Sequence, residues 1–405
     1  MMPVKKGILF VDEEPNVLSG LRRIMHSMND EWDMSFAGSA HEALTIMDSR
    51  SFDVIVSDMR ILCTNGTELL NEVKKKHPQT IRIVLSGQTN RDKILRSISP
   101  IHQFLSKPCD TETIKKTLTR AFTLRDLLVN DNLKQLVSQI ESLPSLPAIY
   151  NEIMEALNSK DASTGKVGEI ISKDMGMSAK ILQLVNSAFF GLPRRLSNPA
   201  QAVIYLGLET IKSLVLSVHL FSQFDQNKLN FMSLNTLWQH SMAVAAISKQ
   251  IIKTEGLGSR IADDAFMAGL LHDVGKLVLA SNFSELYKQA VDLAKTGHLS
   301  IYEAESEIFG SGHGEVGAYL LGIWGLPDSL ILSCAFHHMP MKHKDMSFNS
   351  LGVVHAANVF EHDANPNNHF IKKSLIDEDY ISMSGLSERI PVWRNLSLEI
   401  LKEDP

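Results

Sequence analysis

Short apolar runs alternate with helical periodicity along roughly the first 120 residues of the chain. Runs rich in Ile, Val and Leu at Gly7–Val11, Asp53–Ser57 and Ile81–Leu85 predict buried parallel strands. Two weaker runs, at Met34–Ala37 and His102–Leu105, predict further strands. Apolar residues at helical spacing fill the intervals between these runs. The order predicts an α/β fold built on a doubly wound, five-stranded parallel sheet.

The apolar pattern is continuously helical from Glu112 to about Ile140, with no Pro or Gly to interrupt it. A helix of that length is more than a small sheet can cover, so we expect its second half to leave the sheet as a linker. The helix over 112–140 is also expected to pair with its copy in a homodimer. Two prolines between Leu143 and Pro147 end the pattern. Nearly every later segment has helical periodicity, which predicts an all-α domain.

These changes of pattern divide the chain, whose 405 residues are too many for one hydrophobic core. We predict an α/β domain over residues 1–124 and a linker helix over 125–140. An all-α domain is predicted over 141–345, followed by a C-terminal helical extension over 346–405 that packs on it.

Composition excludes several classes of protein. Hydrophobic residues at 44% and charged residues at 21% are typical of a soluble globular protein, and a net charge of −6 gives no general case for nucleic-acid binding. Neither a helix-turn-helix with a basic recognition helix nor a membrane segment is evident, so we expect no direct DNA binding and no membrane insertion. Three scattered cysteines suit a reducing compartment, and we expect a cytoplasmic protein.

Acidic residues follow two of the predicted strands. Asp12 and Glu13 come directly after the first strand, and Asp58 directly after the third. One acidic residue at a strand end is usually a solvated turn residue. In a doubly wound sheet, however, these two strand ends are neighbours, so the three carboxylates are expected to converge. Crowded carboxylates repel one another unless a cation neutralises them, and such oxygen ligands suit Mg²⁺.

A hydroxyl and an ammonium group are predicted at the same edge. Ser86 ends the fourth strand and Lys107 follows the fifth. This set suits phosphoryl transfer onto a carboxylate: Asp58 would be the nucleophile, and Ser86 and Lys107 would hold the phosphoryl group.

Four motifs at these strand ends resemble the receiver domain of two-component response regulators. They are Val11-Asp12-Glu13-Glu14-Pro15, Ser57-Asp58-Met59-Arg60, Leu85-Ser86-Gly87 and Phe104-Leu105-Ser106-Lys107-Pro108. The resemblance covers residues 4 to about 124 and implies a flavodoxin-like fold in which Asp58 accepts phosphate from a histidine kinase. It also implies that Ser86 and Phe104 reorient as the switch. Leu62 and Phe104 depart from the usual Pro and Tyr, outside the reacting groups.

Histidines are concentrated in the second half of the chain, which holds 11 of the 15, from His219 onward. An adjacent His-Asp pair, His272-Asp273, lies 32 residues after His240. Such a pair is a reasonable metal ligand set if the Asp bridges two cations and the His binds one of them. Imidazole and carboxylate together suit Fe, Mn, Ni or Zn, and such a centre activates water for attack on a phosphoester.

The histidine pattern resembles the HD superfamily of metal-dependent phosphohydrolases. Six residues match ligand positions of its cyclic-dinucleotide-cleaving HD-GYP branch: His240, His272, Asp273, His313, His337 and His338. Lys276 matches the lysine that contacts the substrate phosphate. Asn358 stands where a closing Asp ligand is expected, Thr236 stands where many members supply a carboxylate, and the Gly-Tyr-Pro signature is missing after His338.

The preceding segment resembles the HDOD domain, the signal-output relative of HD hydrolases. The motifs are Leu143-Pro-Ser-Leu-Pro147, Ile170-Ile-Ser-Lys-Asp174, Ser178-Ala-Lys-Ile-Leu182, Val185-Asn-Ser-Ala188 and Ala202-Val-Ile-Tyr-Leu-Gly207. The resemblance runs from about Glu141 to His338. HDOD members are generally not known as enzymes and often lack most of the metal ligands, whereas this chain keeps an unusually full set.

Two functions for the all-α domain stay open at this point. It is either a module that binds a downstream signalling protein, a nucleotide or a cyclic dinucleotide, or a metal-dependent phosphohydrolase controlled by the receiver. The His-Asp pair and Lys276 favour the hydrolase, while Asn358, Thr236 and the missing Gly-Tyr-Pro signature favour the binding module, which we prefer. His362 is expected in a solvated loop.

Overall fold

The computed structural model describes most of the chain. The described residues are 5–58, 61, 67–77, 80–87, 103–107, 111–127, 136–137, 140, 144, 147–157, 163–186, 190, 196–225, 229, 231–345, 347–364 and 375–402. They divide into two compact units, one formed essentially by Met1–Ser142 and the other by Leu143–Leu320 and Pro327–Pro405. Each unit is described by itself.

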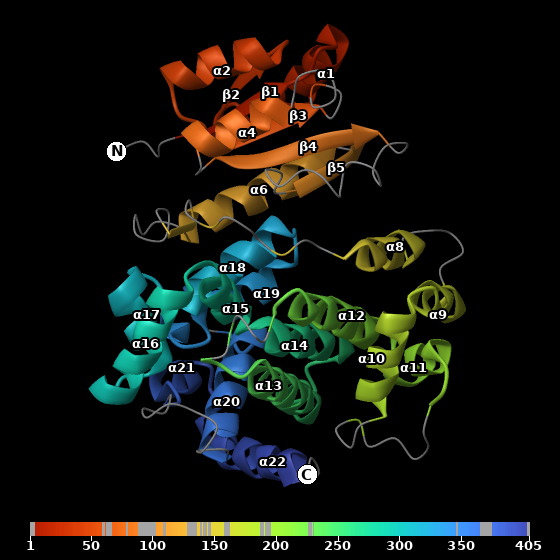
Figure 1. Ribbon diagram of the computed structural model, residues 1–405, viewed down its shortest axis with the longest axis vertical. Helices are drawn as coiled ribbons and strands as arrows, with labels where there is room; N and C mark the ends of the chain where they lie inside the picture. Colours follow the sequence, from red (N-terminus) through yellow and green to blue (C-terminus); the bar gives the residue numbers. More distant parts are fainter. Residues whose placement is uncertain are drawn as a thin grey trace. The chain divides into compact units, whose positions relative to one another are not determined.

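The first unit is built on a five-stranded parallel sheet (Figure 1). Its strands are β1 (Lys6–Val11), β2 (Trp32–Ala37), β3 (Val54–Asp58), β4 (Ile81–Gly87) and β5 (Gln103–Lys107), in the spatial order β2-β1-β3-β4-β5. Every neighbouring pair is parallel. The doubly wound α/β fold predicted from the apolar runs is confirmed.

Helices cover both faces of this sheet, because successive side chains of a buried strand point to opposite faces. Ile8 and Phe10 of β1 pack with the apolar residues of α1 (Pro15–Met25) and α6 (Thr111–Leu127). Leu9 and Val11 pack instead with those of α2 (Ala40–Ser49) and α4 (Thr67–Lys76). A short turn of helix, η1 (His26–Met28), follows α1.

The predicted linker helix is described only in part. Helix α6 ends at Leu127 among the described residues. Leu136 and Val137 are helical and Ile140 is not, while residues 128–135 and 138–139 lie outside the described part. A continuous helix as far as 140, and its pairing in a dimer, therefore stay predictions.

The second unit is all helical, as expected. Its elements are α8 (Ala148–Leu157), α9 (Thr164–Ser172), α10 (Met175–Val185), α11 (Pro199–Leu206), α12 (Leu208–Ser222), α13 (Leu234–Thr254), α14 (Ser259–Leu271), α15 (Val274–Asn282), α16 (Ser284–Gly297), α17 (Ile301–Phe309), α18 (His313–Ile323), α19 (Asp328–Phe336), η4 (Pro340–Lys342), α20 (Ser350–Ala364), α21 (Glu378–Met383), η6 (Ser387–Arg389) and α22 (Ile390–Lys402). None of the described helices combines the length and the apolar character that a membrane span requires.

Helix α13 lies at the centre of this unit and packs against α14, α20 and α22, while α20 also packs against α14 and α19 (Figure 1). Glycines let two pairs of helices approach closely, α13 with α14 and α15 with α18. A Cβ on Gly269 of α14 would lie 2.6 Å from the Cα of Ala245 on α13. A Cβ on Gly275 of α15 would lie only 1.9 Å from the carbonyl oxygen of His313, so this glycine places the start of α18 against α15.

Candidate functional site

The receiver pocket lies at the carboxyl ends of β1, β3 and β5. Val11 of β1 is in register with Ser57 of β3, so Asp12 and Asp58 lie side by side. Both carboxylates are buried, whereas Glu13 is exposed. Lys107, the last residue of β5, places its Nζ 2.8 Å from Oδ2 of Asp12 and 2.6 Å from Oδ1 of Asp58.

The Lys107 ammonium is held in its charged form by this pair. Burial alone would lower its pKa, but the hydrogen bonds and negative charges of Asp12 and Asp58 outweigh burial and raise the pKa of Lys107. The backbone of Ser86 pairs with that of Ser106, beside Lys107, as expected for the same edge of the sheet. The side chains of Ser86 and Phe104, and the whole of Leu62, lie outside the described part of the chain.

The histidines and the aspartate predicted as metal ligands come from four separate places in the sequence of the second unit. His240 lies within α13, His272 ends α14, and Asp273 begins α15. His313 is the first residue of α18, and the pair His337-His338 follows α19. Helix ends thus supply most of this set, which lies within one buried cluster that we call the histidine–aspartate centre.

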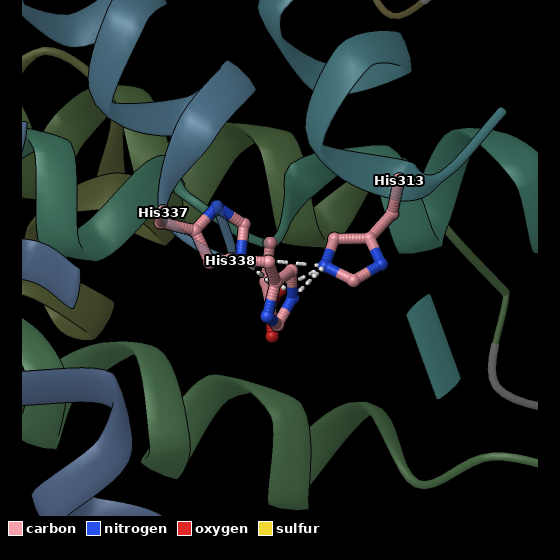
Figure 2. Close-up of side chains that lie close together, drawn as sticks. His313, His337 and His338 are labelled. Carbon is pink, nitrogen blue, oxygen red and sulfur yellow. Dashed lines mark hydrogen bonds and ion pairs between the residues drawn. The ribbon is translucent and has the colours of Figure 1, made fainter. Parts of the chain in front are cut away.

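Asp273 lies in the middle of the histidine–aspartate centre. Its Oδ1 lies 3.1 Å from Nε2 of His313 and 3.7 Å from Nε2 of His337. Its Oδ2 lies 3.5 Å from Nε2 of both His240 and His272. Each carboxylate oxygen therefore faces a different pair of imidazoles. Figure 2 shows His313, His337 and His338 pointing toward one another around this point.

Two of the rings are held from behind by buried glutamates. Nδ1 of His240 donates to Oε2 of Glu361 at 2.6 Å, and Nδ1 of His313 donates to Oε2 of Glu305 at 2.6 Å. The backbone N–H of His313 also donates to Glu305, at 2.7 Å. A carboxylate behind a ring fixes its orientation and makes the other nitrogen a better metal ligand.

Two other rings are held by backbone carbonyls. Nδ1 of His272 donates to the oxygen of Gly269 at 2.7 Å, one turn earlier in α14. Nδ1 of His337 donates to the oxygen of Cys334 at 2.8 Å. In all four of these rings the Nδ1 proton is engaged, so the hydrogen-bond network assigns a lone pair to each Nε2 of the neutral form.

These Nε2 atoms lie close to one another. Among these four rings the Nε2–Nε2 distance is 3.2 Å between His240 and His272 and 3.4 Å between His313 and His337. Nε2 of a fifth ring, His338, lies 2.9 Å from Nε2 of His313. Lone pairs facing at such distances repel unless a proton or a cation lies between them. The chemistry of the donor set therefore fits bound metal, with neutral imidazole and carboxylate ligands.

Charges around the centre divide the histidines into two kinds. Burial would lower the pKa of His313, but Glu305 and Asp273 outweigh it and raise this pKa to about 9. Burial lowers the pKa of His272 to about 4. A proton on His313 therefore faces Asp273 in the absence of metal, and a bound cation would replace that proton.

Asp273 is kept ionised by its neighbours. Burial alone would raise its pKa, but Lys276, His272 and His313 hold it well below the ordinary value. Nζ of Lys276 lies 2.6 Å from Oδ2 of Asp273. The lysine expected at a substrate phosphate thus lies at the edge of the centre, paired with its aspartate.

Two sets of potential ligands share Asp273. One is Asp273, His313, His337 and His338, and the other is His240, His272 and Asp273; the ligand atoms of each set lie within 4.8 Å of one another. We call them the four-ligand group and the three-ligand group. Each group could hold a metal ion, and the Asp273 carboxylate would be available to both.

Helix α20 contributes two further buried polar residues. Nδ1 of His355 donates to the carbonyl oxygen of His337 at 2.7 Å, and its Nε2 accepts the N–H of Asp377 at 2.8 Å. Both ring nitrogens are thus engaged away from metal. Asn358 is also buried, and its Oδ1 has no hydrogen-bond partner among the described residues.

Sequence reasoning missed Glu305 and Glu361, and it placed His362 wrongly. Glu361 is a charged residue in an otherwise apolar stretch of α20, and this contrast was the available signal. Glu305 carries no comparable signal, since it lies in an ordinary amphipathic helix. His362, expected in a solvated loop, belongs to α20, and its ring stacks on His240 with centroids 4.9 Å apart. The error arose because polar residues after His362 suggested an earlier helix end.

Comparison with known protein families matches residues 8–119 to the response regulator receiver domain and residues 143–340 to the HDOD domain. An uncharacterized protein from Treponema pallidum (strain Nichols) is 27% identical over 231 residues, covering 55% of this chain and 44% of that protein. The hydrogenase transcriptional regulatory protein HoxA from Cupriavidus necator is 30% identical over 122 residues, covering 30% of this chain and 25% of that protein. The chain thus spans less than half the length of either relative.

A solved HDOD domain protein with unknown function, from Geobacter sulfurreducens, superimposes with a TM-score of 0.51 at 25% identity. The superposition covers 71% of this chain and 99% of that one. Both family matches agree with the fold: the receiver match falls on the parallel sheet, and the HDOD match on the helical unit that carries most of the histidine–aspartate centre. This chain therefore joins a response regulator receiver domain to an HDOD domain.

Proposed function

We propose that Asp58 accepts a phosphoryl group from a histidine kinase and that this modification controls the HDOD domain. The support is the pair of buried carboxylates bridged by Lys107. In the transfer, a carboxylate oxygen of Asp58 bonds to phosphorus as the phosphorus–nitrogen bond of the kinase breaks, and the nitrogen keeps the electron pair.

The remaining residues of the receiver pocket have supporting roles. Asp12, Glu13 and Asp58 would hold Mg²⁺, which supplies positive charge to the phosphoryl oxygens when bound. Lys107 and Ser86 would hold the product phosphoryl group, and Phe104 would reorient with Ser86. Converting the Asp58 carboxylate to an acyl phosphate adds about one net negative charge and three phosphoryl oxygens at this edge, and this change would shift the face formed by β4 and β5.

For the output, we propose that the HDOD domain holds two cations and uses them to bind a nucleotide or a cyclic dinucleotide. The observation that carries this proposal is the convergence of five imidazoles on the buried carboxylate of Asp273, with Lys276 beside it. Fe, Mn, Ni and Zn all suit such ligands. When bound, the metal would attract the ligand's phosphate oxygens, and Lys276 lies at the same edge to accept a further one.

A second candidate is hydrolysis of a phosphodiester. Asp273 belongs to both ligand groups, and this sharing favours it, because a shared carboxylate is the arrangement that places two cations around one water. Asn358 argues the other way, since a neutral amide in place of an anionic ligand weakens the centre. We therefore place hydrolysis second.

The downstream partner belongs to the same proposal. The HDOD domain would present its ligand-dependent surface to another signalling protein, and the helix over 112–140 would let two copies pair. A cytoplasmic location is proposed from the need to meet a kinase and from the three scattered cysteines.

The metal content of the purified protein tests this function. Wild-type protein should contain about two ions of Fe, Mn, Ni or Zn per chain by elemental mass spectrometry. Asp273→Ala should lose both, whereas the surface variant Asp292→Ala should keep them. Absence of metal in the wild type after reconstitution would overturn the proposal.

A second experiment separates binding from hydrolysis. The metal-loaded protein is incubated with labelled cyclic dinucleotides and mononucleotides, and both retention and product formation are followed. Retention without cleavage supports a binding module, and cleavage that is lost in Asp273→Ala supports the hydrolase. If the metal-loaded protein neither retains nor cleaves any of these ligands, both candidate functions are contradicted.

A further inference from the structure

One face of α20 carries three buried residues with polar side chains, set among apolar neighbours. His355, Asn358 and Glu361 follow at intervals of three residues, so they lie on one side of the helix. Each is at most 2% exposed. Because α20 packs against α13, α14 and α19, this face is enclosed by the helices that carry or adjoin His240, His272 and His337.

The three residues differ in what they contact. His355 is engaged at both nitrogens, by His337 and Asp377. Glu361 accepts the Nδ1 proton of His240 at 2.6 Å, with both side chains at 3% exposure. Asn358, one turn before Glu361, has a buried Oδ1 without a partner among the described residues. The face thus combines a satisfied histidine, an unsatisfied amide and a charged carboxylate.

The two ligand groups have few negatively charged ligands between them. The three-ligand group has Asp273 as its one anionic ligand, and it shares that residue with the four-ligand group. The amide of Asn358 adds no charge. Burying a carboxylate such as that of Glu361 is costly unless the charge is paired or hydrogen-bonded. Its position directly behind a potential metal ligand therefore calls for an explanation.

We infer that Glu361 is a positioning residue that strengthens the three-ligand group through His240 and compensates for the neutral Asn358. Hydrogen bonding to a carboxylate raises the basicity of the distal nitrogen, so negative charge reaches the cation through the ring. Glu305 stands behind His313 in the four-ligand group in the same way. This inference rests on the proposed metal centre.

Calorimetric titration of metal-free protein with Zn²⁺ tests the inference. Wild-type protein should bind two ions. Glu361→Gln should weaken one of them by about 10–100-fold, which is the usual cost of losing such a partner. Glu305→Gln should weaken the other ion. Asp363→Asn, a substitution at a half-buried position of α20 whose carboxylate pairs with Arg394, should change neither.

Double variants assign the loss to one group. Combined with His272→Ala, which removes a ligand of the three-ligand group, Glu361→Gln should add little. Combined with His338→Ala, which affects only the four-ligand group, Glu361→Gln should still weaken Zn²⁺ binding by the same factor as in the wild-type chain. Equal effects in both backgrounds would mean that Glu361 acts on the fold as a whole, and would overturn the inference.

Replacement of Asn358 provides the rescue. Asn358→Asp should restore Zn²⁺ affinity in the Glu361→Gln background to within a few-fold of wild type, because it supplies the missing charge directly. In the otherwise unchanged chain it should tighten binding about tenfold. Asn358→Asp alone can be measured even if Glu361→Gln does not fold. A Zn²⁺ affinity equal to that of wild type in this variant would contradict the inference.

The outcomes separate this inference from the proposed function. If wild-type protein binds no Zn²⁺, the metal centre itself is wrong. If it binds two ions and Glu361→Gln behaves like Asp363→Asn, the centre stands and the role of Glu361 is wrong. Thermal unfolding followed by circular dichroism shows that each variant compared is folded.

Discussion

The receiver pocket and the histidine–aspartate centre both crowd hydrogen-bond acceptors, but they balance them differently. In the receiver, Lys107 bridges Asp12 and Asp58, and its side chain is 25% exposed. In the HDOD domain, Lys276 pairs with Asp273 at one edge, and His272 and His313 are completely buried. A protein cation neutralises the first site, and the chemistry of the second suits bound metal.

This difference suggests different lifetimes for what each site binds. A partly exposed lysine can move when Mg²⁺ and a phosphoryl group arrive, so the receiver pocket is suited to a reversible signal. Rings that are held at Nδ1 by Glu361, Glu305 and backbone carbonyls have little freedom to move. If it binds metal as proposed, the HDOD centre is therefore suited to retaining that metal across many cycles of the signal.

The largest expected effect is on phosphorylation itself. Asp58→Asn should abolish incorporation of phosphate from a small phosphodonor, because an amide does not form the acyl phosphate. Asp48→Asn, an exposed substitution on α2, should leave incorporation unchanged. Mobility on phosphate-affinity gels measures the product.

The same pair of variants tests how the receiver controls the output. Phosphorylation should change the sedimentation behaviour of wild type and Asp48→Asn, and not that of Asp58→Asn. If the sedimentation of Asp58→Asn responds to the phosphodonor like that of wild type, Asp58 is not the residue through which phosphorylation acts. The receiver pocket would then not be the site of the reversible signal.

The receiver pocket could be predicted because strand topology alone brings its residues together. Apolar runs locate β1 and β3, parallel pairing makes their ends neighbours, and Asp12 and Asp58 follow from that rule. What could not be predicted is the closing of Lys107 on both carboxylates, since its long side chain has many rotamers. The exposure of Glu13 likewise depends on the conformation of the turn after β1.

The residues of the HDOD centre could be predicted only from a family resemblance, because no rule of local structure brings them together. His240 and Glu361 are 121 positions apart and meet only because α13 packs on α20. Glu305 lies in a helix whose sequence is that of an ordinary surface helix, so its burial is a result of tertiary packing. The ligands could be matched by motif, but the residues behind them could not.

A substitution at Gly275 tests whether the HDOD centre depends on close helix packing. In Gly275→Ala the new Cβ would lie 1.9 Å from the His313 oxygen and 2.7 Å from the Gly317 nitrogen. Since both are backbone atoms, α15 and α18 must move apart. We expect a loss of about 3 kcal/mol in the free energy of unfolding and a reduced metal content.

Gly165→Ala is the matched control, since it is also a helical glycine in the HDOD domain. Its Cβ would meet nothing nearer than Ser163 Oγ at 3.9 Å. Stability should rise by about 0.5–1 kcal/mol, because alanine has the higher helix propensity. Urea unfolding of both variants gives the comparison, and similar stability for the two would show that packing at Gly275 is looser than described.

The balance of charge in the receiver is tested by removing its cation. Lys107→Met leaves Asp12 and Asp58 buried without their partner, which should cost about 1–3 kcal/mol of stability in metal-free buffer. Mg²⁺ should then raise the melting temperature more in the variant than in wild type, because the lysine no longer competes for the same oxygens. An equal response to Mg²⁺ in both proteins would show that Lys107 does not occupy the cation position.

The smallest expected effect separates a structural histidine from the candidate ligands. Burial lowers the pKa of His355 below 6.5, although its bond to His337 opposes the shift. As pH falls below 6.5 the unfolded chain binds a proton that the folded chain does not, so stability decreases with falling pH, by at most about 1.4 kcal/mol per pH unit. His355→Gln removes this titrating group, so the unfolding free energy of the variant should fall less steeply between pH 6.5 and 5.

The metal content of His355→Gln should stay near that of wild type, because both nitrogens of His355 are already engaged within the protein. Loss of metal in this variant would place His355 among the ligands and extend the HDOD centre onto α20.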